Sequence, residues 1–136
     1  MKFIIPGEPI GKARPRVVNG GKHTYTPART KNYETLVKEL FYYQYGQMLL
    51  EGPIEIDIKA YFKIPKSTSK KNRKAMLDGV LRPEKKPDID NVVKAITDSL
   101  NDLAYLDDKQ IVKAITEKFY SDHPRAVVEI KKVEAL

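Results

Sequence analysis

The chain has no cysteine and only two histidines. Without cysteine it can form neither a disulfide framework nor a zinc site with thiolate ligands. His23 and His123 stand in expected turns, and neither has a partner at metal-ligand spacing. No apolar run approaches the roughly 20 residues that a membrane-spanning helix needs. The first residues, MKFII, also lack the basic and long apolar regions of a signal peptide. We therefore expect a cytoplasmic protein without a membrane segment or an organic cofactor.

The 136 residues are enough for one domain with a sizeable core, and we expect a single domain over residues 1–136. The net charge of +7 is unevenly distributed along the chain. Residues 2–31 carry a net charge of +6 and residues 63–86 a net charge of +7, whereas the remainder carries −6. Separation of charge on this scale favours a polyanionic partner. The alternative, an unusually basic but merely solvated surface, stays open on composition alone.

The hydrophobic pattern predicts an α+β fold with a mixed or antiparallel sheet and about three helices. In residues 54–62 apolar and polar side chains alternate, which is typical of a half-buried strand. Thr30 is expected to cap a long helix, and Val93, Ile96, Leu100 and Leu103 are expected to form the buried face of the last helix. The expected strands are 2–5, 54–62, 110–120 and 125–133, with a hairpin over 16–26 and helices over 30–50, about 67–77 and about 88–103.

Acidic residues gather around the last expected helix, in a chain that is otherwise basic. Asp88 and Asp90 stand at its entrance, and the pair Asp107-Asp108 follows it. An N-cap would explain one of the first two, and a solvated turn would explain the pair. The alternative is a site for a divalent cation that holds a phosphate. Mg²⁺ suits such a site because it binds oxygen ligands and keeps several waters. This interpretation predicts a metal-dependent nuclease.

Lys94 lies between two acids on one face of the same helix, because Asp90, Lys94 and Asp98 are spaced four residues apart. They could form a surface ladder of ion pairs. In the functional interpretation, Lys94 lies beside the metal site and stabilises negative charge as a P–O bond breaks.

The string KPDIDNVVKAITDSLN…LDDKQI, in residues 86–111, resembles the signature of the RusA family of Holliday junction resolvases. The segments IPGEPIGKARPR and TPARTKNYE are also similar to members of that family. The resemblance implies a RusA-like fold and a homodimer that makes paired symmetric nicks in four-way DNA junctions, with Mg²⁺ as cofactor and Mn²⁺ as a substitute. It also implies that Asp88, Asp90 and Asp108 are catalytic metal ligands, that Lys94 is the essential lysine, and that Asp107 assists.

Two basic blocks are the expected DNA contacts. Alternation puts the first group on one side of an extended segment, where it could follow the phosphates. The second group belongs to the loop or helix of residues 63–86. The first group is Lys12, Arg14 and Arg16, and the second is Lys70, Lys71, Arg73, Lys74, Lys85 and Lys86.

Two further functions remain open: a non-catalytic basic DNA-binding module, in which the acids are structural, and an RNA nuclease on the same scaffold. Surplus apolar residues near the end of the first long helix are candidates for the dimer interface, or could pack within the monomer. These are Tyr42, Tyr43, Met48, Leu49 and Leu50; Tyr42, Tyr43 and Tyr45 could instead stack on unpaired bases.

Overall fold

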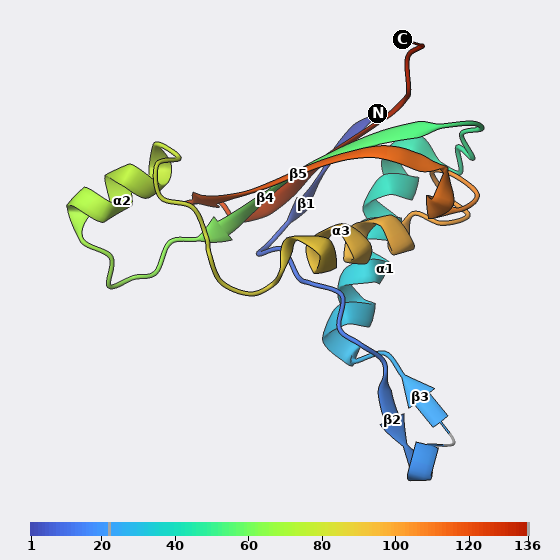
Figure 1. Ribbon diagram of the computed structural model, residues 1–136, viewed down its shortest axis with the longest axis horizontal. Helices are drawn as coiled ribbons and strands as arrows, with labels where there is room; N and C mark the ends of the chain where they lie inside the picture. Colours follow the sequence, from blue (N-terminus) through green and yellow to red (C-terminus); the bar gives the residue numbers. More distant parts are fainter. Residues whose placement is uncertain (22, 136) are drawn as a thin grey trace.

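The computed structural model describes residues 1–21 and 23–135, without the side chains of Arg16, His23 and Tyr25. The expected α+β architecture is confirmed (Figure 1). Every expected strand and helix is present, and most bounds agree within two residues. The elements are β1 (Lys2–Pro6), β2 (Arg16–Val18), η1 (Asn19–Gly21), β3 (His23–Tyr25), α1 (Ala28–Tyr45), β4 (Ile54–Lys63), α2 (Lys70–Leu77), α3 (Ile89–Ser99), η2 (Asp108–Gln110), β5 (Ile111–Ser121) and β6 (Arg125–Lys132).

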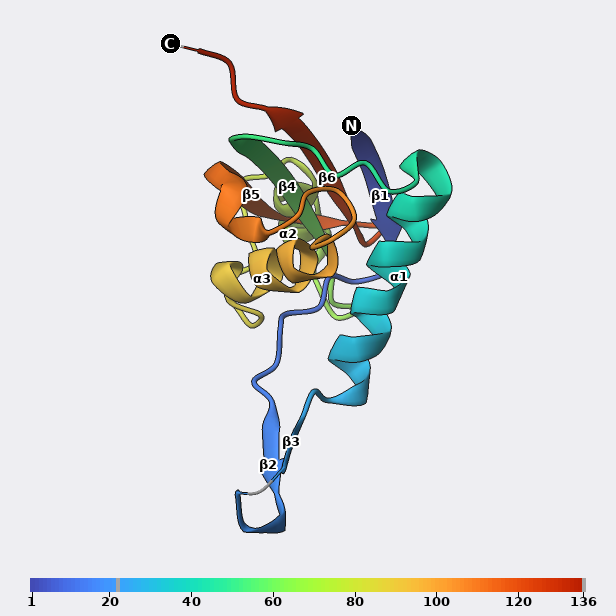
Figure 2. The same cartoon turned by 90° about the vertical axis from the view of Figure 1, so that its right-hand side faces the viewer.

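Four strands form a mixed sheet in the order β1-β6-β4-β5. Strands β4 and β5 are parallel, and the other neighbours are antiparallel. Helices α1 and α3 pack on one face of this sheet, and within the described residues the opposite face carries no helix (Figure 2). The parallel pair needs a long crossover, and residues 64–110 provide it. This crossover contains α2, α3 and both acidic groups, so all the predicted acidic site residues lie on one connection between two parallel strands.

The core lies between the sheet and the two helices. Ile54, Ile56 and Ile58 of β4 are fully buried and face Val37 and Phe41 of α1 within one cluster. The polar residues between them point to the open face, so the alternation expected for residues 54–62 is confirmed. In the described part of the chain, none of the helices is both long and apolar enough to span a membrane.

Two details of the helices differ from the prediction. Helix α1 begins at Ala28 with Pro27 at the N-cap, and it ends at Tyr45 because Gly46 turns the chain at φ 70°. Thr30 therefore lies inside the helix, where its hydroxyl accepts a hydrogen bond from the Ala13 amide.

The buried face of α3 is also turned relative to the prediction. Val92 is buried, together with Ala95, Ile96 and Ser99, whereas Val93 is only partly buried. Leu100 is buried as expected, and Leu103 is partly buried. Ile96 is also buried as expected, but the small side chains Ala95 and Ser99 do not stand out as core positions by hydrophobicity, which is why the predicted face is shifted by one position at its start.

Two segments project from this body (Figure 1). The hairpin β2–β3 extends beyond the N-terminal end of α1, and its turn contains Gly20 at φ 64°. Helix α2 lies beyond the end of the sheet, against the last residues of β5. In Figure 1 the N-terminus of α3 lies between the two projections.

Candidate functional site

At the entrance of α3, its N-terminal end, the carboxylates of Asp88 and Asp90 are accessible to solvent. Asp88 occupies the N-cap position in an extended conformation, yet its side chain makes no capping hydrogen bond. Its carbonyl oxygen accepts from the amides of Asn91 and Val92, each at 3.1 Å, so the backbone closes the first turn. Asp88 and Asp90 are both exposed. Helix capping therefore does not account for either carboxylate.

Two neighbouring segments hold this entrance in place. Gly11 lies so close to it that an added Cβ would stand 2.6 Å from Cβ of Pro87 and 3.2 Å from Cβ of Asn91. The Lys12 amide donates to the Asn91 carbonyl at 2.8 Å. From β5, Nζ of Lys118 donates to the carbonyl of Lys85 at 2.6 Å and of Pro87 at 2.9 Å. The start of α3 is thus fixed from both sides.

Asp98, two turns further along α3, is the centre of a charged cluster. Nζ of Lys12 lies 3.0 Å from both carboxylate oxygens of Glu34 and 3.7 Å from Asp98. Nζ of Lys94 lies 3.4 Å from the same carboxylate. The side chains of Lys12, Glu34 and Asp98 are at most 21% exposed, while that of Lys94 is 61% exposed. Lys94 is therefore the member of the cluster that solvent and a ligand can reach.

Asp108 joins this cluster from the turn before β5. Partial burial raises the pKa of the Asp108 carboxyl, the neighbouring carboxyl groups of Asp98 and Asp107 raise it further, and a hydrogen bond from Asn101 opposes them. The Asp98 carboxyl is therefore a near neighbour of Asp108. Carboxyl groups from two different elements are thus neighbours, and a cation bound between them would relieve their repulsion.

Asp107 has a structural role of its own. Its side chain accepts a hydrogen bond from the Lys109 amide at 2.8 Å and caps η2. The Gln110 side chain accepts from the amides of Leu106 and Asp107, and donates to the carbonyls of Leu50 and Gly52. Gln110 therefore pins the acidic turn to the connection between α1 and β4.

The structure divides the predicted acids into two groups. Asp88 and Asp90 stand at the first turn of α3, and Asp108 meets Asp98 near its end. Eight residues of helix separate Asp90 from Asp98, or about 12 Å at 1.5 Å per residue. Among the described residues, no three acidic, histidine or cysteine side chains are close enough to hold one metal ion together. Asp98 was not among the predicted site residues, although its spacing from Asp90 and Lys94 was a signal.

The basic residues expected to contact DNA have different surroundings. Lys70, Lys71, Lys85 and Lys86 are exposed, as is Arg14. Arg73 forms an ion pair with Asp122, and Lys74 forms one with Asp78 at 2.8 Å. Lys12 is directed at acids of its own chain, as described above. The side chain of Arg16 lies outside the described part of the structure.

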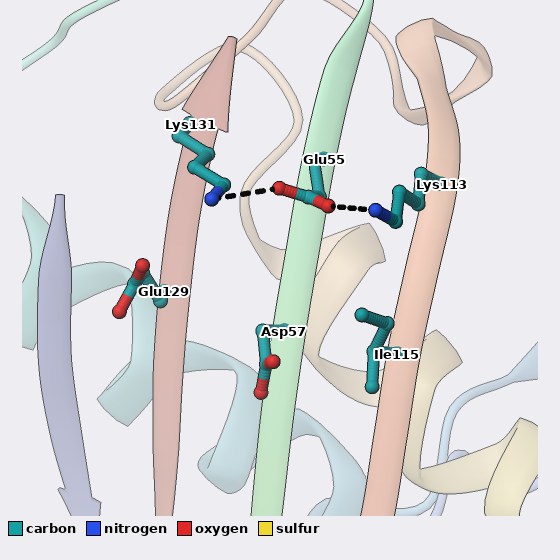
Figure 3. A pocket seen from close by; sticks show the side chains of 6 residues that line it. All are labelled: Glu55, Asp57, Lys113, Ile115, Glu129 and Lys131. Atoms are coloured by element: carbon teal, nitrogen blue, oxygen red, sulfur yellow. Dashed lines mark ion pairs between the residues drawn. The ribbon is translucent and has the colours of Figure 1, made fainter. Parts of the chain in front are cut away.

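A separate hollow of about 260 Å³ lies on the open face of the sheet (Figure 3). Glu55 stands in it between Lys113 at 2.8 Å and Lys131 at 3.1 Å. Hydrogen bonds from these two lysines lower the pKa of Glu55. Asp57 and Glu129, which lie opposite each other in the register of β4 and β6, also line the hollow. This hollow lies across the sheet from α3, so it is separate from the acids of the crossover.

Comparison with known proteins identifies the family to which this chain belongs. Residues 6–131 match the model of the family described as "Endodeoxyribonuclease RusA", and the chain belongs to that family. The resemblance seen in residues 86–111 is therefore confirmed. The chain is also 40% identical over 139 residues to the uncharacterized protein YqaN of Bacillus subtilis (strain 168), with 99% of this chain and 98% of that protein covered.

Proposed function

We propose that this protein is a structure-selective endodeoxyribonuclease that resolves Holliday junctions by paired nicks and requires a divalent metal. Membership of the RusA endodeoxyribonuclease family supports the reaction class. The observation that carries the proposal is the grouping of Lys94, Asp98 and Asp108: Nζ of Lys94 lies 3.4 Å from the Asp98 carboxylate, and Asp98 in turn helps to raise the pKa of Asp108. Neighbouring carboxylates, with an exposed cation next to one of them, suit a site that holds a metal ion and a phosphate together.

The residues present fit Mg²⁺ or Mn²⁺. Mg²⁺ in phosphate-processing sites is held by one or two carboxylates, waters and substrate oxygens, and nucleases of this family generally depend on a divalent metal. Asp98 and Asp108 would hold an ion at one end of α3, and Asp88 and Asp90 at the other, with Asp107 as a positioning residue in the acidic turn. Held by these residues, a divalent ion would supply charge to neutralise the scissile phosphate and would lower the pKa of a nearby water.

Lys94 is placed to act on the phosphate itself. Its side chain stands on the exposed face of α3 between the two acidic groups, one helical turn from Asp90 and one from Asp98. Rotation about its flexible stem can exchange the contact with Asp98 for a phosphate oxygen. There the ammonium group would stabilise the charge that develops as the P–O bond breaks.

The route of the DNA follows from charge and shape. The N-terminus of α3 carries the positive end of the helix dipole, which favours phosphate. On one side of it lies the hairpin with Arg14 at its base, and on the other lies α2 with Lys70 and Lys71 (Figure 1). DNA lying across α3 would therefore meet exposed cations on both sides of the acids.

Paired cutting calls for two copies of the site. A two-fold homodimer offers equivalent sites to two strands of a junction that itself has two-fold symmetry. Tyr42, Tyr43, Met48 and Leu49 are exposed near the C-terminal end of α1, and Leu50 is partly buried. This apolar surface supports an interface at that end of the helix.

A non-catalytic DNA-binding module is the second candidate. It is favoured by the ion pairs that Lys12 makes with Glu34 and Asp98, and by the capping role of Asp107, because both uses of acids are structural. A nicking assay on a synthetic four-way junction, with Mg²⁺ and with EDTA, distinguishes the two. We expect symmetric nicks with Mg²⁺ only, from wild type and from the matched control Glu8→Gln, an exposed acid outside the site. Binding without nicking under both conditions would favour the module.

A further inference from the structure

The turn that follows α2 exposes three apolar side chains within five residues. Leu77 is 49% exposed, Val80 is 74% exposed and Leu81 is 38% exposed. The turn is well ordered by hydrogen bonds, since the amides of Val80 and Leu81 both donate to the Ala75 carbonyl, at 2.9 and 3.1 Å. Gly79 at φ 77° permits this conformation. The three side chains are therefore held out by a defined backbone. We call Leu77, Val80 and Leu81 the apolar tip.

The segment that carries the apolar tip is attached to the body through its charged residues. Nε of Arg82 donates to the Lys118 carbonyl at 2.5 Å, and its guanidinium lies 3.9 Å from the centroid of the Phe119 ring. Arg73 of α2 pairs with Asp122, just beyond β5. Surface segments commonly bury apolar side chains and expose charged ones. Here Arg73 and Arg82 contact the protein while Leu77, Val80 and Leu81 face solvent, which indicates a surface that binds a partner.

The charge around the apolar tip indicates the chemistry of that partner. Lys70, Lys71 and Lys74 are exposed on the helix that leads into the tip, and Lys85 and Lys86 follow it. Residues 63–86 as a whole carry a net charge of +7. A second copy of this surface would be repelled by its own charge, whereas a polyanion with exposed apolar faces would be attracted. Nucleic acid with unstacked bases has both properties.

The apolar tip is also close to the candidate catalytic residues. Leu81 and Asp88 are seven positions apart in the chain, so the two lie within about 25 Å of each other even if that connection is fully extended. A DNA molecule that reaches Asp88 therefore passes within a few base pairs of the tip. At the centre of a four-way junction, stacking is already interrupted, so inserting a side chain there costs less than it does in continuous duplex.

We propose that the apolar tip is a wedge that packs against unstacked bases at the centre of branched DNA, while the lysines around it hold the flanking phosphates. The inference rests on the proposed action on branched DNA and adds to it the residues that select branched over linear DNA. In this arrangement the cations supply affinity for any DNA, and Leu77, Val80 and Leu81 supply the preference for a junction.

The test is binding in EDTA, which separates the wedge from cleavage. The triple variant Leu77→Ser/Val80→Ser/Leu81→Ser is compared with wild type on a four-way junction and on linear duplex of equal length, by fluorescence anisotropy. Loss of base contacts should weaken junction binding by about tenfold or more and leave duplex binding unchanged. A 2-aminopurine at the junction centre should brighten on binding wild type and not on binding the variant.

Two controls make the result specific. Ile4→Ser/Ile115→Ser removes exposed apolar side chains from the open face of the sheet and should leave both affinities unchanged. Leu77→Met/Val80→Ile/Leu81→Met keeps the tip apolar and should retain the preference for the junction. Circular dichroism confirms that each variant is folded.

The possible outcomes separate the wedge from the proposed function. If a folded triple-serine variant keeps the wild-type ratio of junction to duplex affinity, the wedge is wrong while the proposed function stands. If the variant instead converts a dimer to a monomer, the tip is a subunit contact and the wedge is equally wrong. If wild type binds junction no better than duplex and cuts neither, the proposed function fails first.

Discussion

The carboxyl groups of Asp98 on α3 and Asp108 before β5 are neighbours, and Asp98 contributes to raising the pKa of Asp108. One residue belongs to the end of a helix and the other to a turn that Gln110 fixes to a different part of the chain. Two like charges held together by separate elements cost free energy unless a proton or a cation lies between them. The stability of the folded protein at this pair should therefore depend both on pH and on the binding of a metal ion.

Neutralising Asp108 should stabilise the metal-free protein at neutral pH. The folded-state pKa of Asp108 is raised, first by burial and then by Asp98 and Asp107. A raised pKa means that the folded state binds the proton more tightly than the unfolded state does. The carboxylate therefore destabilises the fold above the ordinary aspartate pKa of about 3.9, and this effect disappears below that pH. In EDTA, Asp108→Asn should melt a few degrees higher than wild type at pH 7 and at the same temperature near pH 3.

Thermal melts followed by circular dichroism measure this difference. Mg²⁺ should reverse the order at pH 7, because a cation that binds only the folded site raises the melting temperature of wild type more than that of the variant. Glu8→Gln is the control for a general change in net charge. Equal response of wild type and Asp108→Asn to Mg²⁺ would remove Asp108 from the metal site.

Asp90→Asn should abolish cleavage and leave junction binding intact or tighter. The amide has nearly the same shape as the carboxylate but is a poorer ligand for a hard cation. Since Asp90 is exposed, loss of its charge beside DNA phosphates favours binding if it has any effect. Nicking and anisotropy measured on the same protein preparation give both values. A folded Asp90→Asn protein that nicks at the wild-type rate would exclude Asp90 from the site.

Asp98→Asn provides the matched comparison on the same helix. If Asp98 and Asp108 hold an ion together, this change should lower the nicking rate by about 10- to 100-fold and raise the Mg²⁺ concentration required. An unchanged Mg²⁺ requirement would assign Asp98 to the ion pairs with Lys12 and Lys94 alone.

Lys70 and Lys71 should account for most of the salt dependence that α2 contributes to DNA binding. Arg73 and Lys74 already pair with Asp122 and Asp78. Each lost phosphate contact reduces the slope of log affinity against log salt by roughly 0.9, so Lys70→Gln/Lys71→Gln should reduce it by about 1.8. Neutralising Arg73 and Lys74 as well should reduce the slope further, but by less than the reduction caused by the Lys70 and Lys71 changes. Titrations at several salt concentrations measure the slopes.

The control for this comparison is Lys38→Gln/Lys132→Gln, which removes the same charge from exposed positions outside α2. It should leave the slope nearly unchanged. Equal slopes for the control and the Lys70/Lys71 variant would show that α2 does not contact the DNA backbone.

Gly11→Ala should impair cleavage by moving the entrance of α3. The added Cβ would stand 2.6 Å from Cβ of Pro87, and backbone on both sides limits the adjustment. Overpacking of this kind costs roughly 1–3 kcal/mol, and Asp88 would move with Pro87. Denaturant unfolding measures the loss of stability, and the nicking assay measures the loss of activity. Gly11→Val, which adds more bulk, should make both losses larger. Full activity with wild-type stability would contradict the close packing seen here.

Local patterns predicted most of the fold because the strands and helices have clear periodicity. The alternation of residues 54–62 and the turn at Asn19–Gly21 are examples in which local sequence and tertiary structure agree. The end of α1 was missed because the apolar pattern continues past Gly46, whose positive φ ends the helix. The buried face of α3 was predicted only in part: Ile96 and Leu100 are buried as expected, but the small side chains Ala95 and Ser99 also face the core and have too little hydrophobicity to reveal it.

The candidate site was less predictable because its contacts are long-range. Alternation around Lys12 suggested a side chain that follows phosphates, but nothing local reveals that Glu34 and Asp98 lie beside it. Asp98 was visible only as one member of a charged helix face. Its meeting with Asp108 depends on the turn between α3 and β5, whose position is set by the contacts of Gln110 with Leu50 and Gly52.

The protein should be a two-fold homodimer, because one set of acids per chain provides one cut and resolution needs two on strands of like polarity. Sedimentation equilibrium at micromolar concentration should return about twice the chain mass of 15.6 kDa. Tyr43 is 92% exposed on α1 beside Tyr42, so Tyr42→Glu/Tyr43→Glu should weaken the dimer if the interface includes this end of the helix. Ile4→Glu, exposed on the open face of the sheet, is the control and should remain dimeric. A dimeric Tyr42→Glu/Tyr43→Glu variant would place the interface elsewhere. A wild-type protein that stays monomeric both free and on junction DNA would exclude paired cutting and leave a single-strand nickase.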